Sequence, residues 1–141
     1  MAYADIFPPD KRSDIMARVK SKDTGPELKL RSALHGLGYR FGLHGKRLPG
    51  KPDIVLRRYR TAVFVHGCFW HQHVKCRKSV RPKTNVEFWN TKLDKNIERD
   101  SLNVKHLMDS NWTVFIAWEC QISNGLESVI EKLMGIIHKC N

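Results

Sequence analysis

The residue types best suited to chemistry are concentrated in residues 63–76, which read VFVHGCFWHQHVKC. This stretch contains three histidines, two cysteines and two adjacent large aromatics: His66, His71, His73, Cys68, Cys76, Phe69 and Trp70. Imidazole and thiolate groups bind transition metals, and imidazole also transfers protons near neutral pH. The apolar run 61–65 predicts a buried strand, and Gly67 predicts a turn where the strand ends. The stretch is therefore expected at the end of a strand, where α/β proteins usually keep their chemistry.

A zinc site is the first chemistry that these residues predict. Cys68 and Cys76 flank a histidine, and a later predicted strand would bring Cys120 back to them. Three thiolates and one imidazole are typical of tetrahedral zinc. Either His73 or His71 can supply the nitrogen, and His73 is preferred because this choice leaves His71 facing solvent. For Cys120 alone, burial as a small apolar side chain is the alternative.

A magnesium site is the second chemistry that the sequence predicts. Asp53 follows Pro52 beside a basic loop and precedes an apolar strand. Mg²⁺ prefers hard oxygen ligands, so Asp53 and the main-chain carbonyl of Val65 could hold it. Such an ion would stabilise charge on a scissile phosphate and activate water. The alternative is that Asp53 merely ends a turn.

Three further side chains are candidates for proton transfer or phosphate contact. His71 is a candidate general acid or base, because imidazole titrates near neutrality. His66 could hold a phosphate or could simply be a hydrogen-bonded histidine beside the turn. Glu27 follows Thr24 at the spacing of a helix capping box, which alone would explain it, although nothing forbids a second role.

Aromatic side chains form another group of candidate functional residues. Phe69 and Trp70 are adjacent, so they cannot both point inward from one strand, and at least one is expected to be exposed. Together with Trp89 they could stack on bases or insert between them. Packing around a zinc loop is the alternative for either of the adjacent rings.

Composition restricts the class of protein. The 141 residues suit one domain, residues 1–141, with residues 1–11 as a flexible arm. Lysine and arginine number 25 against 14 acids, for a net charge of +11. This surplus favours a nucleic-acid partner over a solvated basic surface. We expect a cytoplasmic protein without membrane spans, because no apolar run is long enough. Cys140 is interpreted as a spare thiol.

The elements that must position these residues alternate between helix and strand. The sequence predicts an α/β sandwich with a mixed sheet. The predicted helices cover residues 13–19, 24–38, 87–109 and 126–137, and the predicted strands cover 39–43, 53–56, 61–65 and 112–118. On the helix 87–109, one face is expected to carry Phe88 or Trp89, Leu93, Ile97, Val104 and Leu107 or Met108.

The motifs resemble those of the very short patch repair endonucleases, the Vsr-type mismatch nickases of bacteria. The match runs from about residue 12 to residue 120. Its most specific part is Pro-Gly-Lys-Pro-Asp at 49–53 followed by His-Gly-Cys-Phe-Trp-His at 66–71. Two departures are Val65, where the family pattern has threonine, and the two residues between His73 and Cys76, where it has one.

The resemblance implies a restriction-endonuclease-like, three-layer fold with a structural zinc. It also implies Mg²⁺-dependent nicking on the 5′ side of the thymine in T:G mismatches, which arise when 5-methylcytosine deaminates. By position it makes Asp53 the magnesium ligand and His71 the catalytic acid or base, with Glu27 supporting His71 and His66 near the scissile phosphate. The remaining roles implied are zinc ligands at Cys68, His73, Cys76 and Cys120, and DNA contacts at Met16, Phe69, Trp70, Trp89, Lys92 and Asn96.

The sequence-based hypothesis is a monomeric nickase in the bacterial cytoplasm that acts on mismatched double-stranded DNA, with other mismatch-repair proteins as candidate partners. Two rivals remain at this point. One is a restriction-type nuclease that cuts both strands of matched DNA. The other is a zinc-stabilised DNA-binding module without catalysis.

Overall fold

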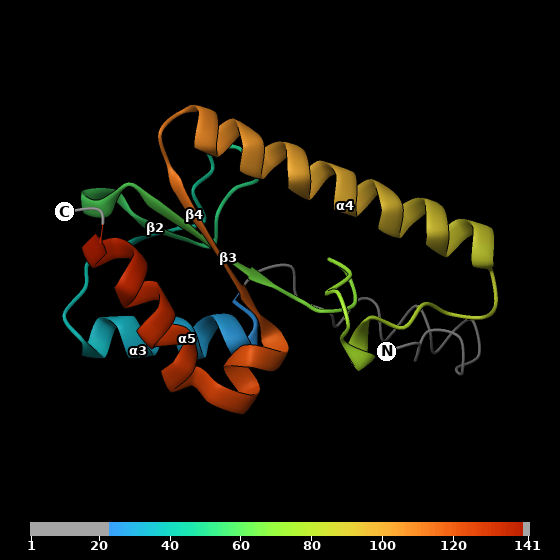
Figure 1. Ribbon diagram of the computed structural model, residues 1–141, viewed down its shortest axis with the longest axis horizontal. Coiled ribbons are helices and arrows are strands. Elements are labelled where there is room, and N and C mark those ends of the chain that lie inside the picture. Colours follow the sequence, from blue (N-terminus) through green and yellow to red (C-terminus); the bar gives the residue numbers. More distant parts are fainter. Residues whose placement is uncertain (1–22, 140–141) are drawn as a thin grey trace.

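The computed structural model describes residues 23–139 and shows three layers, with a mixed sheet between helices (Figure 1). Helix α4 covers one face of the sheet, and α3 and α5 cover the other. This arrangement confirms the predicted α/β class. The elements are α3 (Gly25–Gly36), β1 (Gly42–Leu43), β2 (Ile54–Leu56), η1 (Arg57–Tyr59), β3 (Thr61–His66), η2 (Arg77–Ser79), α4 (Val86–Asp109), β4 (Thr113–Trp118) and α5 (Glu119–Lys139).

Sheet topology explains how Asp53 comes close to the His-rich stretch. The strand order is β1-β2-β3-β4; β1 and β3 run antiparallel to β2, and β4 runs parallel to β3. Ile54 pairs with Val63, so the residue before β2 lies beside the end of β3. Helix α4 provides the long crossover that a parallel pair requires.

Alternation along β3 sends its side chains to two cores. Val63 packs with α3 and α5 in a core built around Leu30, Leu34 and Leu133. Ala62 and Phe64 face the other way and pack against Leu107 of α4. Because successive side chains alternate across a strand, His66 shares the α4 side with Ala62 and Phe64.

Helix α3 begins and ends as its sequence predicts. The Thr24 hydroxyl accepts from the Glu27 N–H at 3.4 Å, and the Glu27 carboxylate accepts from the Thr24 N–H at 3.2 Å, which completes the capping box. After the C-cap, Gly38 adopts a φ of 87° and its N–H donates to His35. Glu27 is nevertheless almost completely buried, with 1% exposure, so capping does not fully explain it.

The other boundaries differ from prediction in specific ways. Only Gly42–Leu43 of the predicted strand 39–43 pairs with β2. Helix α4 buries Trp89, Leu93 and Leu107, whereas Phe88, Ile97 and Met108 are exposed, so the predicted apolar face is buried only in part. Helix α5 begins at Glu119 with a break at Gly125, and the predicted helix from 126 corresponds to the part after this break.

Several expectations lie outside the described residues. They are the flexible arm 1–11, the helix 13–19 with Met16, and Cys140. Among the helices within residues 23–139, none combines the length and apolarity needed to cross a bilayer.

Candidate active site and metal centre

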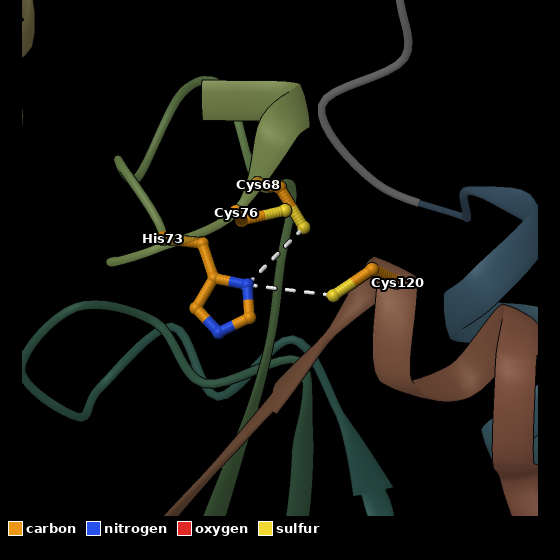
Figure 2. A group of neighbouring side chains, drawn as sticks. All are labelled: Cys68, His73, Cys76 and Cys120. Carbon is orange, nitrogen blue, oxygen red and sulfur yellow. Dashed lines mark hydrogen bonds between the residues drawn. The ribbon is translucent and has the colours of Figure 1, made fainter. Parts of the chain in front are cut away.

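Three cysteines and one histidine converge beside the end of β3 (Figure 2). One ligand atom from each of Cys68, His73, Cys76 and Cys120 lies within 4.8 Å of the others. His73 Nδ1 is 3.6 Å from Cys68 Sγ and 3.4 Å from Cys120 Sγ. A tetrahedral zinc with Zn–S near 2.3 Å and Zn–N near 2.0 Å separates such ligands by about 3.6 Å. The donor set and its spacing are therefore consistent with zinc.

The same geometry decides between the two histidines. His73 belongs to the cysteine cluster, and its ring stacks on Trp118 at 4.2 Å. Burial raises the pKa of the Cys68 thiol to about 12, so without a cation this thiolate would be costly. A bound divalent metal would compensate that cost, as structural zinc sites do. His71 is left for the pocket described next.

The pocket lies where β2 begins and β3 ends. It has a volume of about 650 Å³ and brings residues from β3, the loops and α4 together. The polar residues that line it are Asp53, His66, His71, Asp100, His44, Lys46, Lys51 and Asn103. Two carboxylates, three imidazoles and two lysines thus share one cavity.

His71 and Asp100 form a closely bonded pair in this pocket. His71 Nδ1 lies 2.6 Å from Asp100 Oδ2. Because a carboxylate accepts, Nδ1 carries the proton of the neutral ring and Nε2 keeps its lone pair. The His66 ring stacks on His71 with centroids 3.7 Å apart and planes within 6°. Burial, reinforced by neighbouring His71, lowers the pKa of His66 to about 3, so His66 is neutral at physiological pH.

Asp53 lies in the same pocket on the β2 side. Its Oδ2 accepts a 2.7 Å hydrogen bond from the Val65 N–H. Burial raises the pKa of Asp53 from 3.8 to about 6; the charge of Glu27 also raises it, while the Val65 N–H and His44 oppose the rise. A partly buried carboxylate beside a second acid is suited to a cation, because the cation removes the cost of charging it.

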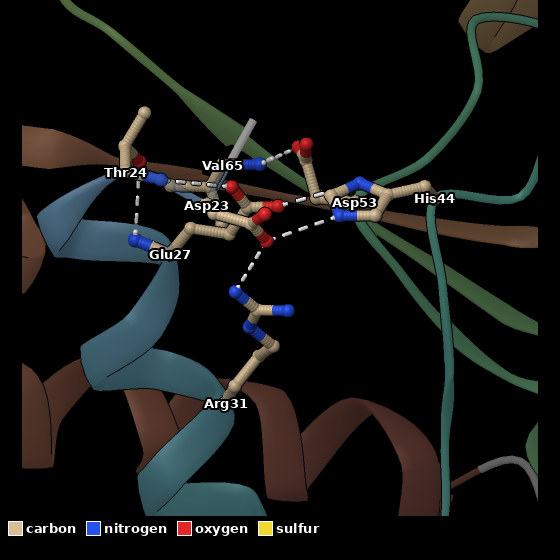
Figure 3. Close-up of polar contacts among 7 residues, drawn as sticks. All are labelled: Asp23, Thr24, Glu27, Arg31, His44, Asp53 and Val65. Carbon is tan, nitrogen blue, oxygen red and sulfur yellow. Dashed lines mark hydrogen bonds and ion pairs between the residues drawn. The ribbon is translucent and has the colours of Figure 1, made fainter. Parts of the chain in front are cut away.

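Glu27 is not placed as the resemblance implies. His71 is held by Asp100, and Glu27 instead faces His44, with Glu27 Oε1 3.7 Å from His44 Nδ1 (Figure 3). The expectation that Glu27 supports His71 is therefore corrected. The reason is topological: α3 covers the opposite face of the sheet from α4, and α4 carries Asp100.

The aromatic residues pack on one another beside the pocket. Ring centroids lie 5.1 Å apart for Phe69 and Trp70, 5.6 Å for Phe69 and Trp89, and 6.0 Å for Trp70 and Trp89. Trp89 is 6% exposed and packs with Leu93. Phe69 and Trp70 are both half-buried, so the expectation that one is exposed is wrong. Both follow the end of β3, in a turn where strand alternation no longer applies.

The two predicted polar DNA contacts differ in their surroundings. Asn96 Nδ2 donates to the Trp70 carbonyl at 3.2 Å, and its Oδ1 accepts from Arg99 at 2.7 Å. Lys92 is exposed on the same helix. Asn96 thus fixes the aromatic loop to α4 in the free protein.

Sequence reasoning gave no role to Asp100, His44, Lys46 or Lys51. Asp100 lies eleven residues after Trp89, a helical separation that places both on one face of α4. That spacing could have indicated it. His44 and the lysines belong to a loop whose course the sequence does not specify, so no pattern pointed to them.

The basic charge, the mixed sheet and the pocket of acids and imidazoles beside a Cys₃His cluster indicate a DNA-cleaving hydrolase. A sequence profile described as "DNA mismatch endonuclease Vsr" matches residues 4–78. The chain belongs to the Vsr family of DNA mismatch endonucleases, and it is a DNA-nicking endonuclease.

Individual relatives agree along most of the chain. The type II nicking enzyme V.NmeAIP of Neisseria meningitidis is 46% identical over 120 residues, which cover 85% of each protein. The type II nicking enzyme V.XorIIP of Xanthomonas oryzae is 44% identical, covering 85% of this chain and 88% of the relative. The DNA mismatch endonuclease Vsr of Escherichia coli is 39% identical over 131 residues, covering 93% of this chain and 83% of the relative.

Proposed function

We propose that the enzyme nicks one DNA strand on the 5′ side of the thymine in a T:G mismatch, in a Mg²⁺-dependent reaction that begins very short patch repair. The observation that carries this proposal is that Asp53 and His71 line one pocket. The names of the relatives add support, since one is a mismatch endonuclease and others are nicking enzymes.

Asp53 and the main-chain carbonyl of Val65 are the proposed magnesium ligands. When bound, Mg²⁺ would supply positive charge against the scissile phosphate and lower the pKa of a bound water. The Val65 side chain is not needed for this role, because a carbonyl is common to every residue. Glu27, close enough to Asp53 to affect its ionisation, is proposed to act on the same side of the pocket.

The two histidines are proposed to divide the remaining chemistry. Asp100 accepts a hydrogen bond from His71 Nδ1, so Nε2 is the nitrogen left to exchange a proton with the attacking water or the leaving oxygen. His66 is neutral and almost completely buried, so it would act as an N–H donor to a phosphate oxygen.

Recognition is proposed to depend on the aromatic cluster of Phe69, Trp70 and Trp89. A T:G wobble pair stacks poorly, so opening it costs less than the few kcal/mol typical of a normal step. Lys92 and Asn96 are proposed to contact the mismatched pair. Met16 is proposed to enter from the minor groove, although it lies outside the described residues. Zinc at Cys68, His73, Cys76 and Cys120 would fix the loop that carries the first two rings.

The cellular setting is proposed on the same basis. The enzyme would act as a monomer in the bacterial cytoplasm, on chromosomal double-stranded DNA. Contacts with other mismatch-repair proteins are part of the proposal.

The experiment is a nicking assay on duplexes of one sequence that differ only in a T:G, T:A or C:G pair, with each strand labelled separately. We expect a single product, from the thymine strand of T:G, only with Mg²⁺. Asp53→Ala should abolish the product and leave DNA binding measurable. Cleavage of both strands of matched duplexes would identify a restriction-type nuclease. Binding without product in Mg²⁺ would identify a non-catalytic module.

A further inference from the structure

Arg81 uses its guanidinium to join the loop after β3 to helix α4. Its Nε donates to Gln72 Oε1 at 2.9 Å, Nη1 donates to Asn90 Oδ1 at 2.9 Å, and Nη2 donates to Asp94 Oδ1 at 2.7 Å. Asn90 and Asp94 are four residues apart, so they lie on one face of α4. An ion pair with exposed Asp94 alone would add little stability. Three acceptors in fixed directions, however, match the planar fork of arginine.

Gln72 passes this restraint on to the turn that carries the aromatic rings. Because guanidinium nitrogens only donate, the Gln72 side-chain oxygen must face Arg81 and its amide nitrogen must face the other way. That nitrogen donates to the Phe69 carbonyl at 2.7 Å and to the Ser79 carbonyl at 3.1 Å. One side chain thus connects the turn, η2 and, through Arg81, helix α4.

The main chain at Gln72 depends on such a restraint. Its φ is 51°, and Lys75 in the same loop has a φ of 59°, both in the left-handed region that residues other than glycine rarely adopt. A residue stays in this costly conformation only where its surroundings fix it. The Gln72 N–H donates to the Phe69 carbonyl at 3.2 Å, the same oxygen that accepts from the Gln72 side chain. Losing the side-chain bonds would therefore loosen the turn.

We propose that Arg81 is a positioning residue for nicking: acting through Gln72, it holds the turn 67–72 in the arrangement that presents the two rings and His71 to DNA. The inference rests on the proposed function for the roles of those side chains. The turn moves as one unit, because the His71 N–H donates to the Gly67 carbonyl at 3.1 Å across it. A looser turn should therefore affect the reaction rate more than the affinity for DNA.

Arg81→Lys is the decisive variant, because lysine keeps the charge and loses the fork. A single ammonium cannot place donors in the three directions that these acceptors occupy. We expect single-turnover nicking of a T:G duplex to slow by about tenfold at saturating DNA. Zinc content should not change, and the dissociation constant for DNA should stay within about twofold of that of wild type.

The same position separates positioning from direct contact with a DNA phosphate. If Arg81 bound a phosphate, lysine would nearly restore the rate, and Arg81→Met would reduce the slope of log affinity against log salt concentration by about one. Positioning predicts instead that Arg81→Lys and Arg81→Met lose nicking rate equally and that the slope stays unchanged in both.

Gln72→Glu tests the second step of the path. Glutamate keeps an oxygen for Arg81 but replaces the donor to the two carbonyls by another acceptor. It should slow nicking about as much as Arg81→Lys. The double variant should be no slower than the slower single variant, because both substitutions interrupt one path.

Arg60→Met is the matched control. Arg60 also donates side-chain hydrogen bonds, to the carbonyls of Ser110 and Asn111, but it precedes β3, at the end of the sheet away from the pocket. Its replacement should lower stability in urea unfolding and leave the nicking rate at saturating DNA unchanged.

A nicking rate in Arg81→Lys within about twofold of wild type would overturn the inference, and so would losses that multiply in the double variant. Amide hydrogen exchange at His71 and Gln72 gives a readout that needs no cleavage, since both N–H groups are bonded within the turn. Exchange should become about tenfold faster in Arg81→Lys and Gln72→Glu and stay unchanged in Arg60→Met. Unchanged exchange in all three would reject the restraint. Faster exchange in the first two would support the restraint even if wild type failed to nick T:G duplexes, a result that would reject only the proposed function.

Discussion

Replacing Asp53 by asparagine should abolish nicking and at the same time stabilise the magnesium-free protein. The asparagine oxygen can still accept the hydrogen bond that the Val65 N–H gives to Asp53 Oδ2. What disappears is a negative charge that is partly buried and close to Glu27. The substitution thus separates the electrostatic cost of the site from its packing.

The magnitude follows from the pKa of Asp53, which rises from 3.8 to about 6 on folding. The unfolded chain ionises first as pH increases, so folding stability is lost between these two values and the full penalty applies above them. Two pKa units correspond to about 3 kcal/mol, which is the upper limit of the gain in Asp53→Asn at about pH 7.5. At about pH 5 the gain should be roughly half as large.

Urea unfolding of zinc-loaded protein at several pH values measures this gain. Chelators must be omitted, because they would also remove the zinc. Asp109→Asn is the matched control: Asp109 is exposed at the end of α4, and its replacement should change stability by less than about 0.5 kcal/mol without a comparable pH trend.

Adding Mg²⁺ should raise the free energy of unfolding of wild type and leave that of Asp53→Asn unchanged. The difference in stability between the two proteins should therefore become smaller. Equal stability of the two proteins from about pH 5 to pH 7.5 would refute the reasoning, since it would mean that the charge on Asp53 carries no cost. A gain in stability that does not change between about pH 5 and pH 7.5 would refute it as well, because ionisation of Asp53 predicts a gain that increases with pH.

The remaining predictions concern zinc, the His71 pair and one glycine. Cys120→Ser should lower the free energy of unfolding by about 3 kcal/mol or more and release zinc in a metal assay, whereas Cys140→Ser should do neither. Asp100→Asn should lower the single-turnover nicking rate by about a hundredfold or more at unchanged DNA affinity, because His71 loses its orienting carboxylate; an unchanged rate would count against the pair. Gly50 has a φ of 75°, and a Cβ there would lie 2.9 Å from a side chain of α4, so Gly50→Ala should cost about 1–2 kcal/mol in urea unfolding. Gly135→Ala, exposed in α5 with open space around it, should stabilise by up to about 1 kcal/mol, and similar effects at the two glycines would contradict this prediction.

The sequence predicted those features that depend on local pattern. The capping box of α3, the turn at Gly38 and the length of α4 follow from residue order and helical spacing. The Cys₃His cluster was also predictable, because few other arrangements explain three cysteines and a histidine near predicted strand ends.

The pairings within the pocket could not be predicted in the same way. The sequence does not show which carboxylate reaches His71, since Glu27 and Asp100 are both on helices near the sheet. The structure decides it, because α4 and α3 lie on opposite faces of the sheet and Asp100 of α4 bonds to His71. The burial of Phe69 and Trp70 depends likewise on the course of a turn that has no periodic pattern.

The loop that carries the aromatic rings Phe69 and Trp70 also carries His71, the proposed general acid or base. Residues 69–71 lie between the proposed zinc ligands Cys68 and His73, which would restrict both ends of this short segment. A rigid segment of this kind cannot move one side chain far without moving its neighbours. Zinc bound at this cluster would therefore affect the position of His71 as well as the stability of the fold.

Helix α4 contacts all three residues of the segment 69–71. Trp89 packs on Phe69 and Trp70, Asn96 bonds to the Trp70 carbonyl, and Asp100 bonds to His71. The separations along α4 are seven and four residues, so the three side chains lie on one face of the helix. If a mismatched base pair displaces the rings, the same movement must also strain the hydrogen bonds that Asn96 and Asp100 make to this segment. Discrimination between base pairs would then appear in the nicking rate as well as in DNA affinity, because the segment proposed to sense the mismatch also orients His71, the proposed proton-transfer residue.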